Sequence, residues 1–195
     1  MIYWLISKVS QLQKKLDDFK IEYYQNEEFK TLTLNDIMGK WSIFFFYPGD
    51  FTFVCPTELG DVADHYEEFQ KAGFEIYSVS TDSHFVHKAW HDTSETIKKI
   101  KYPMLGDRNA IIAKMFEVYK EDEGAAYRGS FIVNPDGEIM AYEINEMGIG
   151  RDAKDLLRRA KAAKFITENP GLVCPAHWEE GKETLKPGLD LVGKI

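Results

Sequence analysis

Two cysteines, Cys55 and Cys174, are the residues of this 195-residue chain whose types point most directly to chemistry. Cys55 follows an apolar run and immediately precedes Pro56, and proline is favoured in the first turn of a helix. The sequence therefore predicts a thiol at a helix N-terminus, where unpaired N–H groups and the helix dipole stabilise an anion. Thiols in such places have pKa values of roughly 3.5–7.5 instead of about 8.5, and the thiolate is the nucleophile. We expect Cys55 to be reactive, whereas the alternative is an inert cysteine buried at a strand end.

The composition of the chain excludes several classes of protein. Its hydrophobic content of 44% and aromatic content of 14% are typical of a chain with a packed core, and its length suggests one domain. The net charge of −8 disfavours binding to nucleic acid. No apolar run is long enough for a membrane helix, and the first residues lack the features of a signal peptide. Two cysteines are too few for a disulfide scaffold, so we expect a soluble, cytoplasmic protein that does not bind membranes.

The elements that must position Cys55 follow an α/β pattern. Residues 41–47 form a nearly continuous apolar and aromatic run, typical of a strand buried on both faces, which ends at 48–50. An amphipathic helix is expected from Pro56 to a stop at Gly73, and residues 74–79 indicate the next strand. A strand, a helix and a strand at this spacing predict a right-handed βαβ unit with parallel strands.

The rest of the chain predicts further elements of one α/β domain. The expected elements are a helical stretch through Leu12 and Leu16, strands at 19–21 and 29–34, helices at 83–90, 109–119 and 152–167, and strands at 128–133 and 138–144 joined by a turn at 134–137. Beyond residues 169–171 the chain becomes rich in glycine, proline and charge, and Cys174 lies there. We therefore expect a domain over 1–168 and a C-terminal arm over 169–195.

The surroundings of both cysteines resemble a known family. Residues 48–56, Pro-Gly-Asp-Phe-Thr-Phe-Val-Cys-Pro, match the Pro-x-x-x-Thr-x-x-Cys motif of the peroxiredoxins. Residues 173–176, Val-Cys-Pro-Ala, followed by Trp178, resemble the resolving-cysteine motif of the typical two-cysteine class. Residues 41–195 resemble the bacterial alkyl hydroperoxide reductase branch of the family. The resemblance is weaker over residues 1–30. It implies a thioredoxin-like α/β fold, with a central mixed sheet flanked by helices.

The resemblance implies a redox role for both cysteines. Cys55 matches the peroxidatic cysteine, whose thiolate attacks a hydroperoxide and becomes a sulfenic acid. Cys174 matches the resolving cysteine, which in this class closes a disulfide between two subunits. The sequence separation of the two residues is equally compatible with a bridge within one chain.

Five further residues match positions that surround the peroxidatic sulfur in the family. Thr52 and Arg128 match the residues that bind the thiolate and the peroxide, and a guanidinium suits both anions. Pro48 matches the proline that shields the sulfur from water. Glu58 and Arg151 resemble groups that orient the arginine.

The resemblance also implies substrates and partners. We expect an antioxidant thiol peroxidase that reduces hydrogen peroxide and small alkyl hydroperoxides without a metal, haem or flavin of its own. Its disulfide would be reduced by the flavoprotein subunit of alkyl hydroperoxide reductase or by a thioredoxin-like protein. The implied assembly is a homodimer, and further a ring of five dimers. The alternative function is a redox-dependent holdase chaperone or a structural ring.

Three apolar residues, Phe85, Val86 and Trp90, are candidates for the contact between dimers. Their spacing on a predicted helix supports a surface role, although a place in the core is equally compatible with it.

Two other kinds of site are disfavoured by spacing. His84, His87 and His91 could share a helix face as zinc ligands, but a surface or subunit-contact helix is the simpler interpretation. His65 lies about 13 Å along the helix from Pro56 at 1.5 Å per residue, too far for the general base of a Cys–His hydrolase. The absence of a Cys-x-x-Cys motif argues against a dithiol reductase.

Members of the family that overoxidise easily carry a Gly-Gly-Leu-Gly insertion and a C-terminal Tyr-Phe helix. Residues 100–107 and 191–195 show neither feature. The resemblance therefore implies a mobile arm, fast disulfide formation and resistance to overoxidation.

Overall fold

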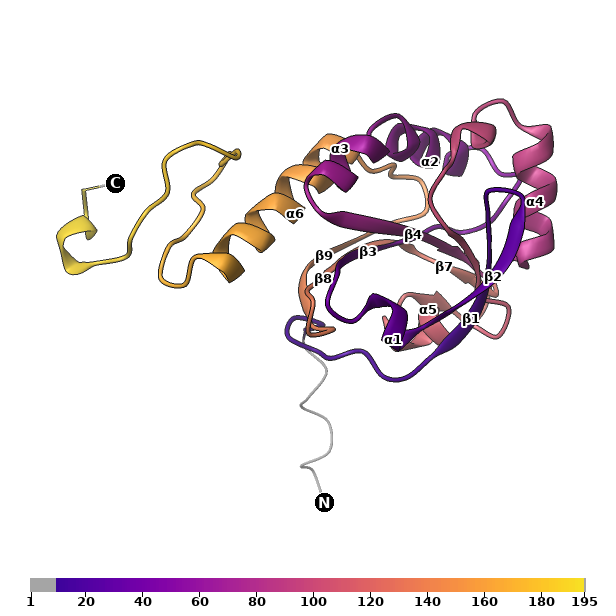
Figure 1. Ribbon diagram of the computed structural model, residues 1–195, viewed down its shortest axis with the longest axis horizontal. Coiled ribbons are helices and arrows are strands. Elements are labelled where there is room, and N and C mark those ends of the chain that lie inside the picture. The colour runs from indigo at the N-terminus through magenta and orange to yellow at the C-terminus, as the bar shows by residue number, and fades with distance from the viewer. Residues whose placement is uncertain (1–9, 195) are drawn as a thin grey trace, which may run out of the picture.

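The computed structural model describes residues 10–194 and contains a mixed seven-stranded sheet with helices on both faces (Figure 1). The strands of this sheet are β1 (Lys20–Gln25), β2 (Glu28–Thr33), β3 (Trp41–Phe46), β4 (Phe74–Ser80), β5 (Met104–Gly106), β8 (Arg128–Val133) and β9 (Ile139–Asn145), while β6 (Tyr119–Lys120) and β7 (Ala125–Ala126) form a separate pair. The helices are α1 (Leu34–Ile37), α2 (Cys55–Asp64), α3 (Tyr66–Lys71), α4 (His84–Thr93), α5 (Ile111–Met115) and α6 (Ala153–Glu168), with short 3₁₀ turns at Ile97–Lys99 and Leu189–Leu191.

The strand order is β2-β1-β5-β4-β3-β8-β9. β3 pairs in parallel with β4, and β4 with β5, whereas β8 pairs antiparallel with β3 and β9 pairs antiparallel with β8. The predicted βαβ unit is therefore present, with α2 and α3 between its two parallel strands. The turn at 134–137 also joins β8 to β9, as predicted.

The central strand β3 divides the core into two layers. All six of its residues are buried, as the apolar run predicts for a strand covered on both faces. Ile43 and Phe45 pack with α2, α3, α4 and α6 on one face, and Phe44 and Phe46 pack with α1 and α5 on the other. Figure 1 shows the same division, with α2, α3, α4 and α6 above the sheet and α1 and α5 below it. This strand leads into the loop that precedes Cys55.

The prediction of a helical stretch through Leu12 and Leu16 is wrong. The segment is irregular and runs beside the start of β9, where Gln13 N donates to Ile139 O at 2.8 Å and Leu16 N donates to Gly137 O at 2.9 Å. Leu16 is buried against the lower layer, while Leu12 is 50% exposed. The spacing of two leucines was too little evidence for a helix, since the backbone groups of the segment form hydrogen bonds beside β9 instead.

Two helix predictions had incorrect boundaries. The helix expected from Pro56 to Gly73 is interrupted at His65, which has φ −104° and ψ 3° and separates α2 from α3. The helix expected over 109–119 is reduced to the short α5, because Ala110 and Glu117 on either side have left-handed φ values of 53° and 57°. The short strand β5, between β1 and β4, had no strong signal in the sequence.

The segment after α6 extends away from the sheet and contains Cys174 (Figure 1). It is tied to α6 by Trp178, whose ring lies 5.0 Å from that of Phe165, and it folds on itself through a bridge between Val173 and Leu185. Within residues 10–194, no helix is both long and apolar enough to cross a membrane.

Candidate active site

Cys55 is the first residue of α2, and Pro56 occupies the following position in the first turn. The side chain of Cys55 is fully buried. Thr57 N and Glu58 N both donate to Val54 O, at 3.0 and 3.3 Å, so the helix begins tightly at the cysteine. The predicted placement of this thiol at a helix N-terminus is confirmed. The positive end of the helix dipole therefore favours an anion at the sulfur.

Arg128, the first residue of β8, supplies a cation to the same sulfur. Its Nη1 lies 3.4 Å from the Sγ of Cys55, and both side chains are buried. Its Nε donates to Met147 O at 2.6 Å, which fixes the plane of the guanidinium. The sheet thus brings into contact two residues that lie far apart in the sequence.

Glu58 lies one turn after Cys55 and binds both buried arginines. Its Oε2 accepts from Nη1 of Arg128 at 2.5 Å, and its Oε1 accepts from Nε and the backbone N of Arg151 at 2.8 and 3.0 Å. One carboxylate between two guanidinium groups leaves a net positive charge beside the sulfur. Because the three groups are buried, their charges are weakly screened.

Arg151, the second arginine bound by Glu58, is itself held by several contacts. Its guanidinium carbon lies 3.5 Å from the centre of the Phe45 ring, and its Nη1 donates to Gly129 O and Ser130 Oγ at 2.7 and 3.2 Å. Burial lowers the pKa of Arg151 from its ordinary value, whereas the hydrogen bond and charge of Glu58 oppose that shift. Arginine starts from so high a pKa that it remains charged here.

Thr52 and Pro48 lie on the loop between β3 and α2. The Thr52 hydroxyl donates to Gly49 O at 2.8 Å, which leaves its oxygen lone pairs, and not its proton, available to another group. Thr52 is exposed and Pro48 is half-buried. Within residues 10–194, no hydrogen bond joins Thr52 to the sulfur of Cys55. The structure thus brings Cys55 and Arg128 together with Glu58 and Arg151, the two residues predicted to orient the arginine. The roles of Thr52 and Pro48 remain predictions.

Cys174 does not lie near Cys55 in this conformation. It lines an apolar groove of about 380 Å³ beside Met140 and Ala141, at the start of β9. Arg128 pairs with Asn145 at the other end of β9, about 13 Å further at roughly 3.3 Å per residue. A disulfide needs Cα atoms within about 7 Å, and both cysteines are free thiols. Burial raises the pKa of the Cys174 thiol, so the groove disfavours its reactive anion.

The three histidines of α4 do not share a metal site. Nδ1 of His84 lies 3.2 Å from Glu22, Nδ1 of His87 lies 2.7 Å from Asp50, and Nδ1 of His91 lies 3.3 Å from the Tyr24 hydroxyl. Each ring therefore has a separate partner, and the rings of His84 and His87 are buried.

Among the described residues, one cluster of possible metal ligands contains a histidine of α4. It consists of Glu27, His91 and Asp92. The ammonium of Lys88 lies 3.2 Å from Glu27 and 2.7 Å from Asp92, so a cation of the chain already neutralises these carboxylates.

The apolar residues of α4 separate into surface and core. Phe85 is 59% exposed and Val86 is half-buried, as a contact surface requires, but Trp90 is 3% exposed. Trp90 packs against the Tyr47 ring, 6.3 Å away between centroids, and belongs to the upper core layer. The suggestion that Trp90 forms a subunit contact is therefore wrong, because the helix face that carries it points to the sheet.

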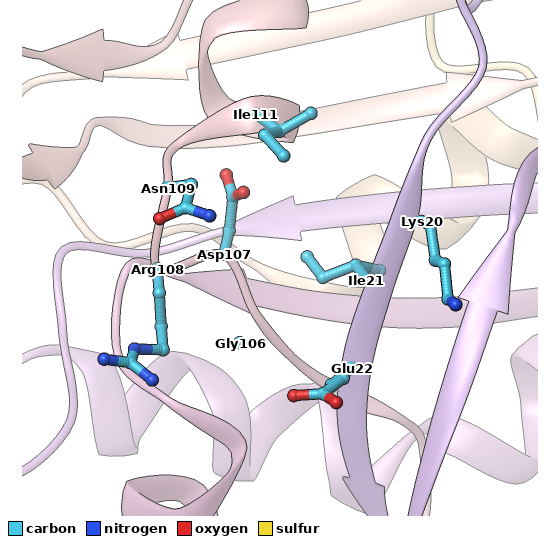
Figure 2. Close-up of a pocket in the computed structure, with 8 residues that line it drawn as sticks. All are labelled: Lys20, Ile21, Glu22, Gly106, Asp107, Arg108, Asn109 and Ile111. Atoms are coloured by element: carbon cyan, nitrogen blue, oxygen red, sulfur yellow. The ribbon is translucent and has the colours of Figure 1, made fainter.

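A cavity of about 420 Å³ lies apart from the cysteines, between β1 and residues 106–111 (Figure 2). The one buried carboxylate in its lining, Asp107, accepts from the backbone N of Ile112 at 3.2 Å and of Ala113 at 2.7 Å. Asp107 thus caps the start of α5, and the cavity contains none of the predicted site residues.

One buried polar pair beside the site was not identified by sequence reasoning. Asp50 was noted only as part of a turn, and His87 only as a possible metal ligand, yet their buried side chains lie 2.7 Å apart, with Asp50 in the loop that precedes Cys55. A buried histidine on an apolar helix face was the available signal, but its partner could not be found without the fold.

A mixed sheet that presents a buried cysteine at a helix start, with an arginine against its sulfur, defines a thioredoxin-like cysteine enzyme of the peroxiredoxin class. The family model described as "AhpC/TSA family" matches residues 12–142. The chain belongs to the AhpC/TSA family of peroxiredoxins.

Individual relatives agree over nearly the whole chain. It is 58% identical to alkyl hydroperoxide reductase C of Salmonella typhimurium and 54% identical to that of Bacillus subtilis, in each case over 96% of this chain and 100% of the relative. Among solved structures, Enterococcus faecalis AhpC superposes with a TM-score of 0.84 at 55% identity, covering 86% of this chain and 100% of that one. The reduced 2-Cys peroxiredoxin of Plasmodium vivax gives 0.87 at 30% identity, covering 93% of this chain and 95% of that one.

Proposed function

We propose that this protein is an antioxidant thiol peroxidase that reduces hydrogen peroxide and small alkyl hydroperoxides through Cys55. The observation that carries the proposal is the buried Arg128 guanidinium 3.4 Å from a buried sulfur at the start of α2. The names of the relatives, alkyl hydroperoxide reductase C, support the class of substrate.

In the first step, the Cys55 thiolate attacks the terminal oxygen of the hydroperoxide. A sulfur–oxygen bond forms as the oxygen–oxygen bond breaks, and the alkoxide or hydroxide leaves and takes up a proton from solvent. The product is a sulfenic acid at Cys55 and an alcohol or water. Arg128 stabilises the thiolate before the step and the charge that develops on the leaving oxygen during it. The roles of Thr52 and Pro48 are to bind the peroxide and to keep water from the sulfur.

In the second step, the Cys174 thiolate attacks the sulfur of the sulfenic acid. The sulfur–sulfur bond forms as the sulfur–oxygen bond breaks, and the hydroxide that leaves takes up a proton from solvent to give water. Cys174 of the same chain lies beside the opposite end of β9, which supports a bridge to the Cys174 of a second subunit. In this proposal residues 1–168 form the peroxidase domain, and residues 169–195 form the arm that presents Cys174 to the partner.

The disulfide must then be reduced by two electrons from another protein. Candidates are the flavoprotein subunit of alkyl hydroperoxide reductase and a thioredoxin-like protein, and no metal, haem or flavin of this chain is needed. Two free thiols suit a reducing compartment, so we infer a cytoplasmic location.

Peroxide consumption by the purified protein, with dithiothreitol as reductant, tests the proposed function. We expect catalytic consumption of hydrogen peroxide and of a small alkyl hydroperoxide. Absence of consumption by the fully reduced protein would contradict the proposal.

Arg128→Met should slow the reaction of Cys55 with hydrogen peroxide by about 10²–10³-fold, because such a donor stabilises charge that develops at the reacting oxygens. Glu58 keeps its bonds to Arg151, so the variant should still fold. Stopped-flow measurement of Cys55 oxidation provides the rate.

Arg158→Met is the matched control, because Arg158 is partly exposed on α6 and binds only Asp155 among the described residues. It should react as wild type does. Equal rates for wild type and Arg128→Met would show that the arginine plays no part in the chemistry.

The assembly that we propose is a homodimer, with five dimers in a ring. The exposed ring of Phe85 lies 5.0 Å from that of Phe29, which is itself 46% exposed, and together they offer an aromatic surface for the contact between dimers.

Phe85→Asp should yield folded dimers in place of the ring, because it places a charge in that contact. Light scattering at micromolar concentration measures the mass. Ile111→Asp, at a 48% exposed position on α5, should leave the ring intact. A monomeric wild type, or a Phe85→Asp variant of unchanged mass, would contradict the proposed assembly.

A further inference from the structure

The sulfur of Cys55 has no exposed surface, although residues close to it lie at the surface of the molecule. The Cys55 side chain is 0% exposed, and Nη1 of Arg128 lies 3.4 Å from its Sγ. A hydroperoxide must therefore bring its narrow oxygen–oxygen end inward, while its organic group remains near the surface. The side chains around this entrance are the ones that contact the organic group.

The loop between β9 and α6, residues 146–152, runs beside the buried sulfur. The Met147 carbonyl accepts from Nε of Arg128 at 2.6 Å. Further along the loop, the backbone of Gly150 lies against Val54, the residue before Cys55, because a Cβ atom on Gly150 would stand 3.6 Å from Cγ1 of Val54. The loop thus contacts both the arginine that binds the sulfur and the residue next to the nucleophile.

This loop is fixed at several points. The first is the bond from Arg128 to the loop, and the second is the backbone N of Arg151, which donates to Oε1 of the buried Glu58 at 3.0 Å. Between them, Ile149 N donates to Glu146 O at 3.0 Å and closes a turn. A segment held in this way presents its side chains in one arrangement, which reduces the entropy lost when a ligand binds.

The side chains that the loop presents beside Val54 are apolar. Met147 is half-buried and Ile149 is 57% exposed, while residues 148 and 150 are glycines. Glu146 carries the one charge of residues 146–150, and its Oε2 accepts from Met147 N at 3.4 Å, so the carboxylate is turned back onto its own loop. An isoleucine that is more than half exposed can still lose apolar surface to water-excluding contact with a ligand.

The exposed phenylalanines before Cys55 do not contribute equally to this wall. Phe51 packs against Trp90, with 5.8 Å between the ring centroids. Phe53 is 93% exposed, so its ring lies almost wholly in solvent. The apolar wall beside the sulfur is therefore formed by the half-buried Val54 and by the two apolar side chains of the β9–α6 loop.

We propose that Val54, Met147 and Ile149 form an apolar subsite for the organic group of alkyl hydroperoxides, and that Ile149 determines the preference for such substrates. The inference rests on the proposed function, in which the Cys55 thiolate attacks the terminal peroxide oxygen. As the sulfur–oxygen bond forms and the oxygen–oxygen bond breaks, the organic group remains on the subsite, and the alkoxide takes up a proton from solvent and leaves as an alcohol.

The chemistry of the subsite selects a hydrocarbon group. The side chains of Val54, Met147 and Ile149 carry no charge and no hydrogen-bond donor. Each methylene group that such contacts withdraw from water contributes about fourfold in affinity. Hydrogen peroxide has no organic group, so it reacts at Cys55 without using the subsite.

Ile149→Ser should change the choice between the two kinds of peroxide. With cumene hydroperoxide, the second-order rate constant for oxidation of Cys55, measured by stopped flow, should fall about tenfold, as expected for the loss of one or two methylene contacts. With hydrogen peroxide, it should stay within about twofold of wild type. The ratio of the two rate constants is the readout, because a general loss of structure or of thiolate reactivity lowers both.

Three further variants test the subsite. Ile149→Leu keeps an apolar side chain of similar volume and should restore the wild-type ratio. Met147→Ser retains the backbone carbonyl that binds Arg128, and it should lower the ratio in the same direction as Ile149→Ser. Ile111→Ser is the matched control, since this isoleucine is 48% exposed on α5, which covers the opposite face of the sheet, and it should change neither rate constant.

Two results would overturn the subsite. If Ile149→Ser slowed the reaction with both peroxides equally, the residue would act on the step that they share and not on the organic group. If neither Ile149→Ser nor Met147→Ser altered the ratio while wild type reduced both peroxides, this inference alone would be refuted. If wild type reacted with neither peroxide, the proposed function itself would fail.

Discussion

Cys55→Ser should reduce peroxide consumption to below about 1% of wild type, because a serine hydroxyl without a general base is almost wholly un-ionised at neutral pH. The substitution changes one buried atom, and the serine oxygen can still accept from Arg128, so the fold should persist. Consumption of hydrogen peroxide with dithiothreitol measures the loss, and a melting curve checks the fold.

Cys174→Ser is the matched control for this experiment, since it removes the other cysteine of the chain. It should still oxidise Cys55 once, at the wild-type rate. If a folded Cys55→Ser variant retained more than a few per cent of the activity, the reaction would have to occur at another residue.

Cys174→Ser should lose about 99% or more of its turnover with a disulfide reductase, because no thiolate remains to convert the sulfenic acid to a disulfide. Its sulfenic acid persists and is exposed to further peroxide. Turnover coupled to nicotinamide oxidation measures the loss, and the disulfide-linked dimer should disappear from a non-reducing gel.

The same pair of variants tests whether the disulfide joins two subunits or forms within one chain. An equimolar mixture of Cys55→Ser and Cys174→Ser should form a linked dimer on addition of one equivalent of peroxide, if each bridge joins two subunits. A wild-type protein that forms its disulfide only within one chain would contradict the proposed arm exchange, as would normal turnover by Cys174→Ser.

Much of the framework around the cysteine could be predicted from local sequence. The run at 41–47 predicted a strand buried on both faces, and β3 is fully buried. Pro56 predicted a helix start at Cys55, because its fixed φ and missing N–H suit the first turn. Boundaries failed where the backbone leaves the helical region, as at His65 and Ala110, since no residue type there required it.

The roles predicted for Arg128, Glu58 and Arg151 came from resemblance to a family, which did not give the geometry of their contacts. The residues next to Arg128 in the sequence give no local pattern that predicts its burial, yet it is 4% exposed and bonded to Cys55 and Glu58. Its contact depends on β8 lying next to β3 in the sheet, a pairing that no local periodicity encodes.

The sequence by itself thus determined that Cys55 begins a helix and that a buried strand precedes it, because these follow from neighbouring residues and their backbone preferences. Only the tertiary structure decided which charges surround the sulfur, that His87 holds Asp50, and that Cys174 lies beside the far end of β9. The physical reason is that a buried charge is stable only beside a partner, and the order of strands in the sheet, not the spacing of residues in the chain, selects that partner.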